Sequence, residues 1–148
     1  MEINHWVVLG CAVLSMVVGS LWYGPLFGKQ WMALVGGTDC TNASPEEKKA
    51  MQKKMMPLYL IQFVLALFQL YVLVYMVTAA EYTFGTSSAA TSLWIWAAFI
   101  MPTTASAAMW TGDTSSAKWS KFLIQAGYQF VLAALFGVIF GAYYPVVG

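Results

Sequence analysis

The charged residues of this chain are clustered so tightly that they leave four long stretches without Asp, Glu, Lys or Arg, over residues 3–28, 55–80, 82–112 and 122–148. Each stretch exceeds the roughly 20 residues that an α-helix needs to cross about 30 Å of hydrocarbon. No water reaches the backbone inside a bilayer, so each stretch must satisfy its own hydrogen bonds, as an α-helix does. A β-barrel would show an alternation of period two, which these stretches lack. The sequence therefore predicts four transmembrane helices.

The composition supports the same class. Only 9% of the 148 residues are charged and 60% are hydrophobic, whereas a soluble domain carries about 25% charged residues to cover its surface. We expect a single all-α domain over residues 1–148, an integral membrane four-helix bundle whose main partner is the lipid bilayer. The spans are predicted at about 3–23, 57–80, 89–110 and 121–144. A net charge of +1 and the absence of arginine argue against nucleic acid as a partner.

The lysines predict the orientation of the chain. All seven lie in residues 29–54 and 118–121, which are the first and third connections between the predicted spans. The positive-inside tendency places both connections in the cytoplasm and both termini outside. Glu2 has no Lys or Arg near it, which is the wrong charge for a signal peptide, so we expect the first span to be retained. Aromatic residues at the cytoplasmic ends of the spans are predicted to act as interfacial anchors: Trp22, Tyr23, Trp31, Trp110 and Trp119.

Two helix boundaries are expected in the first connection. Gly24 and Pro25 should end the first helix, because proline disfavours a helical conformation in the residue before it. Residues 26–35 then read as a short amphipathic helix that lies in the interface. A further helix should begin after Ser44, since Glu47 completes a capping box and a proline stands at the first helical position.

The two halves of the chain resemble each other. Residues 22–31 and 110–119 both begin and end with tryptophan and carry glycine at their third position. This indicates a duplicated two-helix hairpin whose two copies run in parallel. In that arrangement Gln62 and Gln125 are equivalent and face each other across the bundle core.

No predicted span has Asp, Glu, Lys, Arg or His in its interior, although proton relays, ion-coupled transport and voltage sensing usually depend on such groups. His5 stands alone at the outer interface, with no Cys/His cluster that would hold a metal. Serine and cysteine nucleophiles therefore lack a base. We expect no enzyme activity, no metal and no cofactor.

Neutral polar residues in the spans have two interpretations. They would line a small polar cavity, or they would only form hydrogen bonds between helices. Pro102 is expected to kink the third span beside two of them. The residues concerned are Gln62, Gln69, Thr103, Thr104, Gln125 and Gln129.

Small residues repeat every four positions along the first and fourth spans, which allows close contact between helices. The contact would lie within the chain or across a homo-oligomer. These helix-packing residues are Ser15, Gly19, Ala133, Gly137 and Gly141.

The segment LWYGPLFGKQWM at residues 21–32 is distinctive. It resembles the WYGPLFGKxWM signature that ends the first span in a family catalogued as domain of unknown function 1761. The segment LIQAGY at residues 123–128 is similar to that family's fourth-span pattern. The resemblance covers essentially the whole chain and implies a four-span protein of a bacterial cytoplasmic membrane. It brings no assigned activity, so it assigns no functional residue.

Three functions remain open. The first is a non-catalytic membrane component that acts by helix packing, as a homo-oligomer or as an accessory or lipid-binding part of a larger membrane complex. The second is a small pore or carrier for a neutral or weakly charged solute, lined by the polar residues of the spans. The third is a membrane enzyme with an interfacial cluster of Trp22, Tyr23, Lys29 and Asp113.

Overall fold

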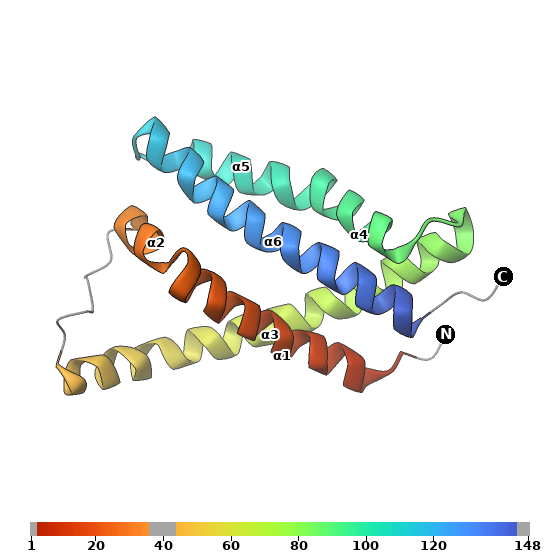
Figure 1. Ribbon diagram of the computed structural model, residues 1–148, viewed down its shortest axis with the longest axis horizontal. Helices are drawn as coiled ribbons and strands as arrows, with labels where there is room; N and C mark the ends of the chain where they lie inside the picture. The colour runs from red at the N-terminus through yellow and green to blue at the C-terminus, as the bar shows by residue number, and fades with distance from the viewer. Residues whose placement is uncertain (1–2, 36–43, 145–148) are drawn as a thin grey trace.

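The computed structural model describes residues 3–35 and 44–144, and all regular structure within those two ranges is helical (Figure 1). The elements follow in the order α1 (His5–Leu21), η1 (Trp22–Leu26), α2 (Gly28–Val35), α3 (Pro45–Phe84), α4 (Ser88–Ile95), η3 (Trp96–Ile100), α5 (Met101–Met109) and α6 (Ser115–Tyr143). The elements η1 and η3 are single π-helical turns.

Four continuous helical stretches are long and apolar enough to cross a membrane: His5–Leu26, Pro45–Phe84, Ser88–Met109 and Ser115–Tyr143. This confirms the predicted all-helical class with four candidate spans. In Figure 1, the stretch from α4 to α5 lies beside α6, while α1 and α3 cross on the other side of α6. The helix α1 begins at the same end of the molecule at which α6 ends.

The helix α3 is much longer than predicted. It runs unbroken from Pro45 to Phe84, 40 residues or about 60 Å, where the sequence indicated a short helix followed by a separate span from residue 57. Its predicted start is correct: the Ser44 hydroxyl accepts from the Glu47 amide at 3.2 Å, and the Glu47 carboxylate accepts from the Ser44 amide at 2.8 Å. Pro57 removes one backbone hydrogen bond without ending the helix.

The first helical stretch ends near the predicted break, but one residue after Pro25 and not before it. The first span continues through Pro25 as the π-helical turn η1, in which the Phe27 amide donates to the Trp22 carbonyl at 2.9 Å. In an α-helix the proline ring would clash with the carbonyl four residues earlier, and the wider π turn relieves that clash. Phe27 then leaves the helix, and α2 occupies the segment predicted as an amphipathic helix.

The third span changes from α-helix to a π-helical turn just before Pro102. The π-helical turn η3 ends at Ile100, and Pro102 lies in the first turn of α5. The Thr103 hydroxyl donates to the carbonyls of Phe99 at 2.6 Å and Ile100 at 2.9 Å. The Thr104 hydroxyl donates to the Ile100 carbonyl at 2.8 Å. Both threonines thus satisfy backbone carbonyls of their own span.

The buried core lies between α1, α3 and α6. Its largest fully buried side chains include Val8, Val74, Val77 and Phe140. The first part of α3 stands apart from this core, because every residue from 44 to 62 is exposed. Much of the apolar surface of this chain therefore faces its surroundings, as expected for a helix solvated by lipid.

Candidate functional site

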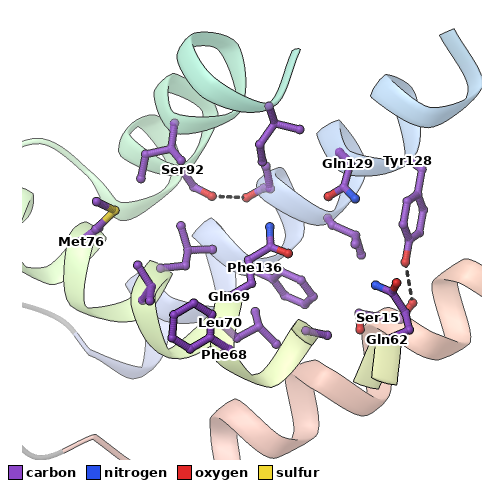
Figure 2. Close-up of a pocket in the computed structure, with 17 residues that line it drawn as sticks. Ser15, Gln62, Phe68, Gln69, Leu70, Met76, Ser92, Tyr128, Gln129 and Phe136 are labelled. Atoms are coloured by element: carbon purple, nitrogen blue, oxygen red, sulfur yellow. Dashed lines mark hydrogen bonds between the residues drawn. The ribbon is translucent and has the colours of Figure 1, made fainter. Parts of the chain in front are cut away.

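A cavity of about 370 Å³ lies between α3 and α6, with further wall residues from α1, α4 and η3. Apolar side chains such as Leu70, Leu132 and Phe136 form most of its wall (Figure 2). The polar side chains that line it are Ser15, Gln62, Gln69, Ser92, Tyr128 and Gln129. No Asp, Glu, Lys, Arg or His is among the described lining residues.

Two of these polar groups hold the helices together. The Tyr128 hydroxyl on α6 donates to the Ser15 carbonyl on α1 at 3.0 Å. The Ser92 hydroxyl on α4 donates to the Ala133 carbonyl on α6 at 2.7 Å. The Ser15 hydroxyl donates within its own helix, to Ala12 at 2.7 Å. These three hydroxyl groups thus already donate hydrogen bonds within the wall. The glutamine amides are the polar groups that remain open to the cavity.

The three glutamine amides have no hydrogen-bond partner among the described residues. Gln62 and Gln69 are exposed and Gln129 is half-buried. Figure 2 shows the amides of Gln69 on α3 and Gln129 on α6 directed into the space between these helices. An amide without a partner is costly in hydrocarbon, because it loses the hydrogen bonds that water would supply. This cavity therefore offers hydrogen bonds to a further molecule.

The structure brings together only part of the predicted polar set. Gln62, Gln69 and Gln129 line the cavity, whereas Gln125, Thr103 and Thr104 do not belong to its wall. Gln129, one turn further along α6, lines the cavity instead of Gln125. The two glutamines share a face of α6, so which of them lines the cavity depends on where along its length α6 meets it, and sequence spacing alone does not give that position.

The small residues of the fourth span pack against α4. A Cβ atom added at Gly137 would lie 2.7 Å from the Ala89 Cα atom and 2.9 Å from the Ser92 Cβ atom. One at Gly141 would lie 3.5 Å from the Ser88 Cβ atom. In the first span, a Cβ atom at Gly19 would lie 3.1 Å from the Tyr128 hydroxyl oxygen. Of the two contacts left open by the sequence, the one within the chain is therefore present.

Two serines of α4 were missed by the sequence reasoning. Ser88 and Ser92 are 2% and 1% exposed, and Ser88 donates to the Glu81 carboxylate at 2.7 Å. Their spacing of four residues matches that of the glycines on α6, and this spacing is the signal that could have identified them. They make α4 narrow enough for the close approach of α6.

The WYGPLFG segment forms an aromatic cluster at the cytoplasmic end predicted for the first span. The Trp22 indole donates to the Ile124 carbonyl of α6 at 3.0 Å. The Tyr23 ring lies 5.1 Å from the Trp31 ring and 5.4 Å from the Tyr128 ring, centroid to centroid. These three aromatic residues of the first connection hold η1 and α2 against α6, a role beyond the predicted anchoring.

The tryptophans of the second half have different surroundings. Trp110 is 88% exposed and Trp119 is 48% exposed, as expected of anchors. Trp22 is half-buried and hydrogen-bonded, so it differs from its supposed equivalent Trp110. The donor that matches Trp22 is instead Trp96 at the start of η3, whose indole donates to the Ala126 carbonyl at 3.1 Å. The duplication stays a prediction.

A salt bridge closes the connection between α5 and α6. The Lys121 ammonium lies 2.7 Å from the Asp113 carboxylate, and Lys118 donates to the Met109 carbonyl at 3.0 Å. The hydrogen bond from Lys121, with a smaller contribution from Thr111, lowers the pKa of Asp113. Asp113, which the enzyme hypothesis placed with Trp22 and Tyr23, is thus engaged by Lys121.

We expect this salt bridge to stabilise the protein at neutral pH and to do so less in acid. A carboxyl group whose pKa is lower in the folded state contributes stability above its unfolded pKa and loses it as the pH falls through the folded pKa. Wild type should therefore unfold at a higher temperature than Asp113→Asn at pH 7, and the difference should shrink as the pH falls below about 4. Thermal unfolding of both proteins in detergent from pH 7 to pH 3 measures it. A difference that stays constant over that range would contradict this assignment.

At the other end of the molecule, the His5 ring nitrogen Nδ1 lies 2.7 Å from the Tyr71 hydroxyl oxygen. The Asn4 backbone is joined to the Tyr144 hydroxyl, which accepts from the Asn4 amide at 3.0 Å and donates to the Asn4 carbonyl at 3.1 Å. Among residues 3–35 and 44–144, no three His, Cys, Asp or Glu side chains are grouped as a metal would require.

These features define a helical protein with four candidate membrane spans and an uncharged pocket between them. A family model described as "Protein of unknown function (DUF1761)" matches residues 6–141, and the chain belongs to that family. This confirms the resemblance carried by the WYGPLFG segment. No curated protein and no solved structure matches the chain significantly.

Proposed function

We propose that this protein is a non-catalytic component of a bacterial cytoplasmic membrane that binds a membrane-soluble molecule in the pocket between α3 and α6. The observation that supports this proposal is a set of three glutamine amides in a mostly apolar cavity. They belong to Gln62, Gln69 and Gln129, and they have no hydrogen-bond partner among the described residues. An apolar pocket with a few convergent polar groups is the usual form of a small-molecule site.

The orientation proposed from the lysines is supported by the arrangement of the helices. The lysines of the described residues belong to α2, to the first part of α3 and to the beginning of α6. These three segments lie at one end of the molecule, opposite the start of α1 and the end of α6 (Figure 1). Positive charge at that end would place it in the cytoplasm and both termini outside.

The test compares three proteins extracted gently from their own membrane: wild type, the triple variant Gln62→Leu, Gln69→Leu, Gln129→Leu, and Gln125→Leu. Gln125 is a matched control, because it is a half-buried glutamine on α6 that does not line the pocket. Native mass spectrometry should show a bound molecule on wild type and on the control, and a loss of at least tenfold in occupancy on the triple variant. Equal occupancy in all three would refute the proposed site.

The same spectra report the assembly. We propose that the protein acts as a homo-oligomer or within a larger membrane complex, because residues 52–62 of α3 are all exposed. A mass equal to several copies, or to one copy with another protein, supports this. A single copy at all protein concentrations counts against it.

A carrier or small pore for a neutral solute is the second candidate. The observation that favours it is the spacing of Gln62 and Gln69, which are two turns apart on α3, about 10 Å along the helix axis. Two amides in succession would give a solute two successive hydrogen-bonding sites along its path. Glycerol flux into proteoliposomes should then fall in the triple variant and persist in Gln125→Leu, whereas a binding protein would give no flux in any of the three.

A further inference from the structure

We infer that the pocket takes an uncharged lipid whose polar part carries carbonyl or hydroxyl oxygens and lies near the middle of the bilayer. The inference rests on the proposed function and names the class of molecule bound. Three observations carry it: the depth of Gln69, the absence of charge in the described pocket wall, and the exposure of the α3 side chains that border the pocket.

The depth comes from the position of Gln69 in α3. Gln69 follows Lys54 by 15 residues and precedes Glu81 by 12 residues in one unbroken helix. At 1.5 Å per residue these separations are about 22 Å and about 18 Å, and the hydrocarbon layer is about 30 Å thick. The Gln69 amide therefore lies close to the bilayer midplane. The head groups of ordinary phospholipids stay at the interface, so they do not reach this amide.

The chemistry of the wall selects an uncharged group. No described lining residue carries a charge that would balance a phosphate or an ammonium group, and an unpaired charge in hydrocarbon is strongly disfavoured. Each glutamine amide both donates and accepts hydrogen bonds. Carbonyl and hydroxyl oxygens satisfy such amides without charge, and Gln69 and Gln129 present them from opposite walls (Figure 2).

The wall also indicates how the molecule reaches the site. Phe68, Val72 and Met76 line the pocket and are 70%, 39% and 51% exposed. These side chains lie between Lys54 and Glu81, within the part of α3 that crosses the hydrocarbon layer, so their exposed surface meets lipid. The pocket is therefore open to the bilayer along α3, and a lipid chain can enter sideways and pack against Leu132 and Phe136.

The experiment uses the full-length protein in lipid nanodiscs and a long-chain alcohol that bears a diazirine on its chain. After illumination, mass spectrometry should locate the label within residues 62–76 of α3 and 128–136 of α6. Labelling should fall at least fivefold in Gln69→Leu and remain unchanged in Gln125→Leu. Unlabelled diacylglycerol and a prenylated quinone are added as uncharged competitors, and phosphatidic acid with the same acyl chains as the diacylglycerol is the charged one.

We expect diacylglycerol, the quinone or both to reduce the label on wild-type protein at a tenfold lower concentration than phosphatidic acid. The more effective of the two distinguishes an ester-linked glycerol from a ring carbonyl as the natural polar group. Equal competition by phosphatidic acid would overturn the inference and leave the proposed lipid pocket standing. Label absent from both segments would overturn the inference and the proposed function together. The competition needs no variant, so misfolding of Gln69→Leu does not affect it.

Discussion

Gly137→Ala is expected to be among the most destabilising single substitutions in this protein. The added Cβ atom would lie 2.7 Å from the Ala89 Cα atom and 3.1 Å from the Ser88 carbonyl oxygen. Both are backbone atoms of α4, so the whole helix must move away from α6. Overpacking of this kind costs about 1–3 kcal/mol, and here it would also stretch the hydrogen bond from Ser92 to the Ala133 carbonyl.

Thermal unfolding in detergent measures the effect, and Gly10→Ala is the control. A Cβ atom at Gly10 would meet nothing within 4 Å, and alanine favours a helix over glycine by about 1 kcal/mol. We therefore expect the unfolding temperature to fall for Gly137→Ala and to stay level or rise for Gly10→Ala. If both variants unfold at the wild-type temperature, the close contact between α4 and α6 is not present in the protein.

The second large effect is expected at Gly28, where the first span turns into α2. A Cβ atom at Gly28 would lie 2.8 Å from the Tyr23 carbonyl oxygen, which is again a backbone atom. Gly28→Ala should therefore displace α2 and break the contact between the Tyr23 and Trp31 rings. Hydrogen exchange should show at least tenfold faster exchange in α2 and little change in α4.

Gly24→Ala is the matched control in the same segment, because a Cβ atom there would meet nothing within 4 Å. It should exchange like wild type throughout α2. Faster exchange of α2 in the Gly24 variant as well would mean that any replacement of a glycine in this segment disturbs α2. The contact of Gly28 with Tyr23 would then not be the specific cause.

The helical class and the number of spans were predictable because the bilayer imposes them on any long uncharged stretch. The course of the backbone at Pro25 was not. Proline excludes the regular α-helical bond at its own nitrogen, and both a helix end and a π turn satisfy that restriction. Contact of the Trp22 indole with α6 and of Gly28 with the Tyr23 carbonyl favours the π turn. The first contact joins residues that are distant in sequence, and the second exists only once the turn has formed. The local sequence therefore does not reveal either of them.

The sequence predicted a polar cavity between the spans as one of two interpretations, but it did not predict all of the residues that line it. Glutamine inside a span signals a polar contact, and three of the four predicted glutamines line the cavity. Which of Gln125 and Gln129 lines it depends on where along its length α6 meets the cavity, and the sequence does not give that position. Thr103 and Thr104 were candidates for the cavity wall or for hydrogen bonds between helices, yet their hydroxyls donate to the Phe99 and Ile100 carbonyls of their own span.

The length of α3 gives the molecule a mechanical asymmetry. Val74, three quarters of the way along α3, is fully buried, while the residues at the start of the helix are exposed. About 43 Å of helix separates Val74 from Pro45, and about 7 Å separates it from Gln69. If α3 tilts about Val74, residue 45 moves roughly six times as far as Gln69.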